Sequence, residues 1–182
     1  MTAEYAGTLG YFVIKKNAVG VLSNAHVMRN VSDKLISPAR KDGGTPNDYI
    51  GTVQTSTVTT YVDCAYAPLR GRITNFNLKD GTAVTGSEEA QVGTPIRYYG
   101  RTSGSVRNGA VRSINWSGFV SGRRFDNQIM ITESVLPGDS GSLLLNREND
   151  RAIGLIFADI GGSGLANRIE NVLNALGVVI AV

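Results

Sequence analysis

Short apolar stretches alternate with turn-forming residues along most of this chain, and this rhythm limits the folds open to it. Glycine accounts for 22 of the 182 residues, well above the usual share of about 7%. Many of the apolar stretches are rich in β-branched residues, which favour strands. The pattern predicts an all-β fold with tight turns, and its strands are expected at 9–14, 18–23, 49–60, 64–69, 96–99, 105–116, 128–132, 142–145 and 152–157.

The end of the chain changes its hydrophobic period. Apolar residues there fall at i, i+3, i+4 and i+7, which is the stripe of an amphipathic helix: Ile169, Val172, Leu173 and Leu176. Gly177 stands where a glycine commonly ends a helix. We therefore expect a C-terminal helix at 169–177.

Residues 70–93 contain few large apolar side chains, and we interpret them as a connector. They join a strand-rich N-terminal half, 1–69, to a strand-rich C-terminal half, 94–168. Closing each half into a barrel would pair the exposed edges that many short strands create. The sequence thus predicts one domain over 1–182, made of two barrels and a helix.

Composition narrows the function classes. The chain is 42% hydrophobic and 18% charged, enough apolar material for a core and unlike a disordered chain. The net charge of +3 does not by itself indicate a nucleic-acid partner. The lone Cys64 excludes an intrachain disulfide, and the lone His26 excludes a multi-histidine metal site. With no apolar run long enough for a bilayer and no signal-peptide pattern, we expect no membrane contact and a cytoplasmic location.

Three short segments carry the residue types of nucleophilic catalysis. SNAH ends at His26, VD ends at Asp63, and PGDSGS contains Ser140. A nucleophilic serine needs a base, a carboxylate that orients the base, and backbone N–H donors for the developing oxyanion. The order His, Asp, Ser differs from the orders found in subtilisin and in α/β-hydrolases. It places the base and the carboxylate in the first half and the nucleophile in the second.

These three motifs, in this order, resemble those of the chymotrypsin-like (trypsin-like) serine peptidases. The resemblance runs from Gly7 to the C-terminal helix, and it is strongest to small disulfide-free bacterial members and their plant narrow-leaf-type relatives. It implies two six-stranded antiparallel β-barrels with a C-terminal α-helix. It also implies a serine endopeptidase that acts on peptide or protein substrates, with no cofactor, no metal and no nucleic acid.

The resemblance assigns a role to each motif residue. Ser140 would attack the scissile carbonyl, and His26 would take its proton and pass it to the leaving amine. Asp63 would orient His26 and stabilise the imidazolium. The backbone N–H groups of Gly138 and Ser140 would form the oxyanion hole.

One departure concerns Asp139, which precedes the nucleophile. Many members of the family are activated by cleavage, and a freed N-terminal Ile or Val amine then pairs with this aspartate. The start of this chain has no such segment. Asp139 must therefore find another partner or leave its loop mobile, and we expect no activation by N-terminal clipping.

Substrate specificity is expected to depend on a second group of residues. In the family, the position of Ser134 lies at the base of the S1 pocket, so the absence of an acid there argues against a preference for Arg or Lys. Phe157, Ala158 and Asp159 would pair with an extended substrate. Asp159 or Glu133 would bring negative charge near the pocket, or Asp159 would narrow it. We favour a small or medium apolar residue at P1.

Other functions remain open at this point. The chain could be a non-catalytic or activator-dependent binding module on a protease fold, an esterase, or a basic nucleic-acid-binding barrel. The intact set of His26, Asp63 and Ser140 argues against the first. The low aromatic content, 7%, argues against the last. Cys64, in an apolar run, is better read as a small buried side chain than as a nucleophile. The sequence does not define the oligomeric state.

Overall fold

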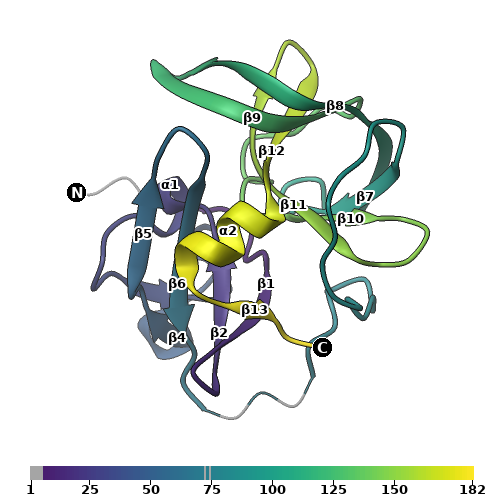
Figure 1. Ribbon diagram of the computed structural model, residues 1–182. Coiled ribbons are helices and arrows are strands. Elements are labelled where there is room, and N and C mark those ends of the chain that lie inside the picture. Colours follow the sequence, from purple (N-terminus) through teal and green to yellow (C-terminus); the bar gives the residue numbers. More distant parts are fainter. Residues whose placement is uncertain (1–5, 72, 74) are drawn as a thin grey trace.

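The computed structural model describes residues 6–71, 73 and 75–182. It consists of two strand-rich halves and a C-terminal helix that lies against both of them (Figure 1). The helix, α2 (Ile169–Leu176), packs on strands of both halves. It ends at Gly177, whose φ of 64° is left-handed and whose N–H bonds back to the carbonyls of Leu173 and Asn174. The helix predicted from the apolar stripe is confirmed.

The N-terminal half contains six strands and one short helix, with two single-turn 3-10 segments between β3 and β4. Four of the strands form one antiparallel sheet in the order β1-β2-β6-β5, while β3 and β4 pair with each other. An isolated bridge from Gly51 to Leu69 links β4 to the chain just after β6. The elements are β1 (Tyr11–Lys15), β2 (Ala18–Ser23), α1 (Ala25–Met28), β3 (Lys34–Ile36), β4 (Tyr49–Thr52), β5 (Thr55–Val58) and β6 (Asp63–Pro68).

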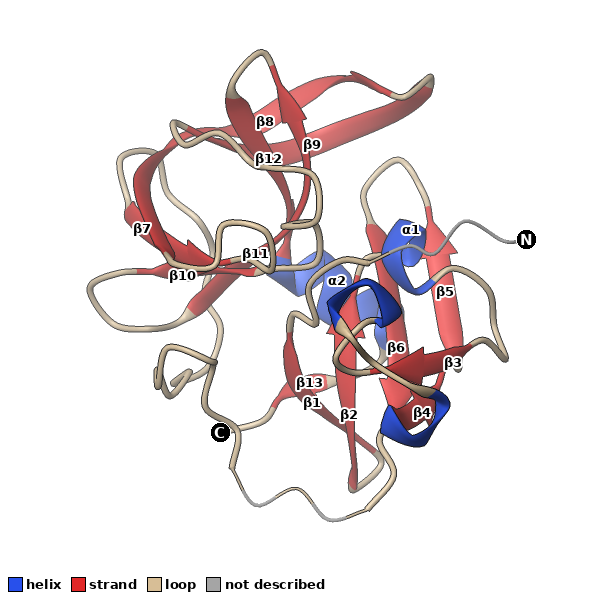
Figure 2. Cartoon of the chain, turned by 180° about the vertical axis from the view of Figure 1, so that it is seen from behind, coloured by secondary structure: helices blue, strands red, loops and turns tan. Residues whose placement is uncertain are grey.

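The C-terminal half forms a closed barrel of six antiparallel strands in the order β10-β11-β12-β9-β8-β7, seen from behind in Figure 2. Closure pairs the strands on both sides within the barrel, while the far end of the β8–β9 hairpin pairs only with itself. The fold class predicted from the sequence is confirmed. The strands are β7 (Pro95–Tyr99), β8 (Val106–Val120), β9 (Arg123–Ile131), β10 (Leu143–Asn146), β11 (Ala152–Ile160) and β12 (Ser163–Arg168).

The last strand, β13 (Val179–Ile180), returns to the N-terminal half. It pairs antiparallel with β1, where Val13 lies opposite Ile180, and so extends that sheet to five strands. The chain therefore crosses from the second half, through α2, back to the first.

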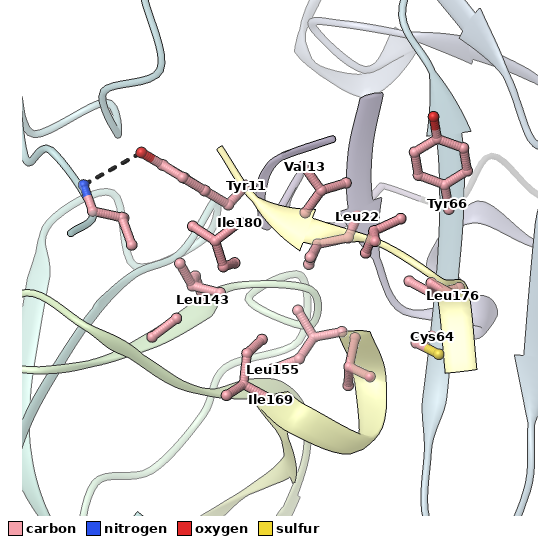
Figure 3. Close-up of a cluster of buried hydrophobic side chains, with 14 of the residues drawn as sticks. Tyr11, Val13, Leu22, Cys64, Tyr66, Leu143, Leu155, Ile169, Leu176 and Ile180 are labelled. Carbon is pink, nitrogen blue, oxygen red and sulfur yellow. Dashed lines mark hydrogen bonds between the residues drawn. The ribbon is translucent and has the colours of Figure 1, made fainter. Parts of the chain in front are cut away.

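The largest hydrophobic cluster belongs to both halves (Figure 3). Leu22 and Tyr66 contribute from the first sheet, Leu155 from the barrel, and Ile169 from α2. The expected connector also takes part, because Val84 is buried in this cluster and its N–H donates to the Tyr11 hydroxyl at 3.3 Å. Burial of apolar surface thus joins the two halves directly.

The expectation of one continuous strand at 49–60 is wrong. The stretch 49–60 is two strands, β4 and β5, because the chain changes partners at Val53 and Gln54. Val53 exchanges backbone hydrogen bonds with the segment before β3, while the Gln54 N–H donates to the Tyr66 carbonyl of β6. In the described part of the chain, no helix has both the length and the apolar character to cross a membrane.

Candidate active site

His26 and Asp63 meet because their elements are neighbours. His26 lies in α1, directly after β2, and Asp63 begins β6, which pairs with β2. The Nδ1 of His26 lies 2.7 Å from the Oδ2 of Asp63, and the His26 backbone N–H donates to Oδ1 at 3.1 Å. Because a carboxylate can only accept, Nδ1 carries the proton in the neutral ring, and Nε2 is then the basic nitrogen.

A chain of buried side-chain amides is hydrogen-bonded to the backbone of Asp63. The N–H of Asp63 donates to Oδ1 of Asn167, and the Nδ2 of Asn167 donates to Oε1 of Gln128, at 2.9 and 2.6 Å. On the other side, Asn24 Nδ2 donates to the Asp63 carbonyl at 2.9 Å. All three amide side chains are fully buried. Asn167 and Gln128 come from the second half, so this chain fixes Asp63 across the junction of the halves.

Ser140 sits at the junction from the opposite side. It belongs to a loop of residues 137–141, called here the Ser140 loop, between β9 and β10. A Cβ built on Gly7 would lie 2.7 Å from the Val27 side chain and 3.0 Å from the Ser140 carbonyl oxygen. The Ser140 loop therefore lies beside the turn that carries His26. The Ser140 hydroxyl donates to the Phe157 carbonyl at 3.3 Å, a long and weak bond.

Asp139 has a partner within the chain. Its fully buried carboxylate accepts hydrogen bonds from the N–H groups of Thr102 and Ser103, both at 2.9 Å, and from the Ser103 hydroxyl. These donors belong to the turn that follows β7, called here the 101–103 turn. Of the two outcomes expected for Asp139, the structure has the first, another partner.

A hydrogen-bonded carboxylate lies in the region expected to form the specificity pocket. Asp159, near the end of β11, accepts hydrogen bonds at Oδ2 from the Ser134 hydroxyl at 3.0 Å and from the Val135 N–H at 2.9 Å. Its Oδ1 accepts from the Gly162 N–H at 2.9 Å. The Ser134 carbonyl is held in turn by the Tyr98 hydroxyl. Asp159 therefore ties β11 to the segment ahead of Ser140.

Two buried acids have pKa values raised to about 12. Burial raises the pKa of the Cys64 thiol to about 12, with a further contribution from the charge on Asp63. Burial raises the pKa of Tyr98 to about 12, and the Asp139 charge adds to it. A thiol that stays protonated is a poor nucleophile. This supports the interpretation of Cys64 as a packing residue.

The sequence did not point to several of these residues. Thr102, Gln128 and Asn167 carry no motif, and their roles depend on contacts between distant segments. Among the described residues, no group of three or more His, Cys, Asp or Glu side chains is arranged to hold a metal ion.

Comparison with solved structures identifies the fold. No family model matches the sequence, and a search of curated proteins finds no match. Solved structures do match over nearly the whole chain. Protease A of Thermobifida fusca has a TM-score of 0.79 and 22% identity, covering 97% of this chain and 92% of its own.

Two further structures agree. Nocardiopsis protease has a TM-score of 0.77 and 17% identity, covering 96% of this chain and 92% of its own. A chymotrypsin of Cellulomonas bogoriensis has a TM-score of 0.74 and 21% identity, covering 95% and 89%. The chain therefore has the chymotrypsin-like double-barrel fold of bacterial serine proteases.

Proposed function

We propose that this protein is a serine endopeptidase that hydrolyses peptide bonds through an acyl-enzyme on Ser140. The observation that carries the proposal is the 2.7 Å contact between His26 Nδ1 and the buried Asp63 carboxylate, beside the loop that bears Ser140. Solved structures that share this fold include bacterial proteases. Peptides or proteins are the substrates proposed.

In this mechanism, Nε2 of His26 takes the proton of the Ser140 hydroxyl as its Oγ bonds to the scissile carbonyl carbon. The imidazolium then donates that proton to the leaving amine, and the acyl-enzyme forms. A water molecule, deprotonated by His26, attacks the ester carbonyl, and the imidazolium returns that proton to Ser140 Oγ as the acid leaves. Asp63 stays ionised throughout and stabilises the imidazolium at Nδ1.

The developing oxyanion would be stabilised by the N–H groups of Gly138 and Ser140. Gly138 has a φ of +102°, a conformation that glycine adopts without the steric cost of a Cβ. Loss of one such donor typically costs about 3–4 kcal/mol of transition-state stabilisation.

Substrate would bind as an added strand along Phe157, Ala158 and Asp159. The P1 side chain would then enter between β11 and the segment that contains Ser134. Because the Asp159 carboxylate is hydrogen-bonded to the Ser134 segment, we expect it to limit the depth available to that side chain. This supports a small or medium apolar residue at P1.

Labelling with a fluorophosphonate probe tests the proposal. The wild-type protein should be labelled, and Ser140→Ala and His26→Ala should not be. Ser113→Ala is a matched control, since its hydroxyl bonds Asn115 on β8, away from the site. A peptide library digested with the unlabelled wild-type protein would then define the P1 residue.

The Ser140 hydroxyl bond to the Phe157 carbonyl favours one alternative. A serine whose proton is engaged there would have to turn toward His26 before reacting. A non-catalytic or activator-dependent binding module is therefore the second candidate. Folded wild-type protein that resists the probe would support it. The cytoplasmic location expected from the lack of a signal-peptide pattern stays a prediction.

A further inference from the structure

Every carbonyl oxygen from Pro137 to Ser140 accepts a hydrogen bond. Two of the bonds come from Thr8: its N–H donates to the Ser140 carbonyl at 2.9 Å, and its hydroxyl donates to the Gly138 carbonyl at 3.0 Å. The Asp139 carbonyl accepts from Ser142. The Pro137 carbonyl accepts from the Thr102 hydroxyl at 2.7 Å. The Ser140 loop is thus held at each peptide by a defined donor.

The bond at Pro137 has a special consequence for the next residue. In a trans peptide the C=O and the N–H point in opposite directions. The donor that fixes the Pro137 carbonyl therefore also fixes the direction of the Gly138 N–H, one of the two proposed oxyanion donors. Without it, this peptide could rotate at low cost, because glycine tolerates both orientations.

The Thr102 hydroxyl lies directly against this glycine. A Cβ built on Gly138 would be 2.2 Å from the Thr102 Oγ1. The same turn holds the loop at a second point, since the N–H groups of Thr102 and Ser103 bind the Asp139 carboxylate. It also reaches Thr8, because the Arg101 N–H donates to the Thr8 hydroxyl at 2.9 Å. Since that bond takes up Thr8 Oγ1 as an acceptor, the hydroxyl proton is available for the Gly138 carbonyl.

We propose that Thr102 is a positioning residue for the oxyanion hole: its hydroxyl holds the 137–138 peptide so that the Gly138 N–H faces the reacting carbonyl. The 101–103 turn then provides the hydrogen-bond partner of Asp139 that, in cleavage-activated members of the resembled family, a freed N-terminal amine would provide. The inference rests on the proposed function of Ser140, but the anchoring itself is measurable without activity.

The test compares Thr102→Val, which loses the hydroxyl at nearly constant shape, with Thr102→Ser, which keeps it. Thr85→Val is the matched control, because Thr85 is also exposed and its hydroxyl also donates to a carbonyl, that of Asn149, at 2.7 Å. Two quantities are measured in each variant: kcat and KM on a peptide substrate, and amide hydrogen exchange of residues 137–141. Thermal melting confirms that each variant is folded.

We expect Thr102→Val to lower kcat by about tenfold with KM within about twofold, less than the loss of a whole oxyanion donor. Exchange should rise at Asp139, whose N–H donates to the Leu136 carbonyl at 2.9 Å, Thr102→Ser should restore both quantities, and Thr85→Val should change neither. Unchanged exchange in folded Thr102→Val overturns the inference, whether or not the protein is active. A fall in kcat that Thr102→Ser does not restore also overturns it. An inactive wild-type protein with raised exchange in Thr102→Val refutes the proposed function and leaves the anchoring supported.

Discussion

Arg101 and Asp42 form a bidentate ion pair that joins the two halves of the molecule. The Nε and Nη2 atoms of Arg101 each lie 2.6 Å from a different oxygen of the Asp42 carboxylate. Arg101 belongs to the 101–103 turn, and Asp42 to a 3-10 turn of the first half. The turn that binds the Ser140 loop is therefore also attached to the first half. Both groups line a groove of about 920 Å³ that includes Gly7 and Val27, next to His26.

The first prediction concerns pH and this pair. The hydrogen bonds from Arg101 lower the pKa of Asp42 below its ordinary value. A lowered folded-state pKa stabilises the fold at neutral pH, and this stabilisation is lost as pH falls through that pKa. Asp42→Asn should therefore melt at a lower temperature than wild type at pH 7, and the difference should shrink at about pH 3 or below. Arg101→Lys, which keeps the charge without the two-point contact, should fall between them at pH 7. Equal melting temperatures at pH 7 would contradict this prediction.

The second prediction concerns Asp159. Asp159→Gly removes the carboxylate that joins β11 to Ser134 and Val135, so larger P1 side chains should fit. We expect the ratio of kcat/KM for a P1 Phe peptide over a P1 Ala peptide to rise at least about tenfold, a shift of about 1.4 kcal/mol. Asp159→Asn keeps the size and loses the charge, so it should leave the ratio near that of wild type. If wild type instead strongly prefers Arg or Lys and Asp159→Asn loses that preference, the carboxylate binds the substrate.

The third prediction concerns the buried amide chain. Asn167→Ala leaves the Asp63 N–H and the Gln128 amide oxygen without their partner. Unsatisfied buried polar groups cost about 1–3 kcal/mol each, so the free energy of unfolding should fall by about that amount or more in urea titrations. Asn174→Ala, at an exposed position of α2, should stay close to wild type. A fall no larger than that of the control would mean that water replaces the lost amide.

The fourth prediction concerns Cys64. With a pKa of about 12 and no exposed surface, the thiol should resist iodoacetamide in the native protein at pH 8.5 and react once the chain is unfolded. Mass spectrometry counts the adducts. Above about pH 9 the unfolded thiol ionises while the folded one does not, so stability should fall as pH rises toward 12. Rapid native labelling would show that this region opens.

The fifth prediction concerns N-terminal clipping. Because Thr102 and Ser103 already hold the Asp139 carboxylate, deletion of residues 1–5 should leave peptide hydrolysis within about twofold of the full chain. A large increase in kcat on deletion would mean that a freed amine supplies a better partner.

Local patterns predicted the fold class well. The 3.6-residue stripe gave α2, and short β-branched stretches gave most strands. Strand β12, with its Gly164, Asn167 and Arg168, was missed because its sequence is polar and small. Its conformation depends on pairing with β9 and β11, and Gly164 lies where a side chain would collide with Val135. Requirements set by tertiary packing produce no periodic pattern in the sequence.

In the candidate site, too, some residues could be predicted from local sequence and others could not. The residue types of His26, Asp63 and Ser140 stand in recognisable motifs, because their chemistry restricts their neighbours. Thr8, Thr102 and Asn167 act on segments far away in sequence, and any of them reads locally as a common polar residue. The partner of Asp139 could be required by chemistry but not located, because the donors are backbone N–H groups of a turn.

The pairing of β13 with β1 has a consequence for the order of folding. Strand β1 leaves the ribosome well before β13, the strand that covers its outer edge. Until residues 179–180 emerge, one edge of the first sheet stays unpaired, and the shared cluster lacks Ile169 and Leu176. Native contacts this distant in sequence slow folding. During synthesis, the N-terminal half therefore reaches its final form only after residues 179–180 have emerged.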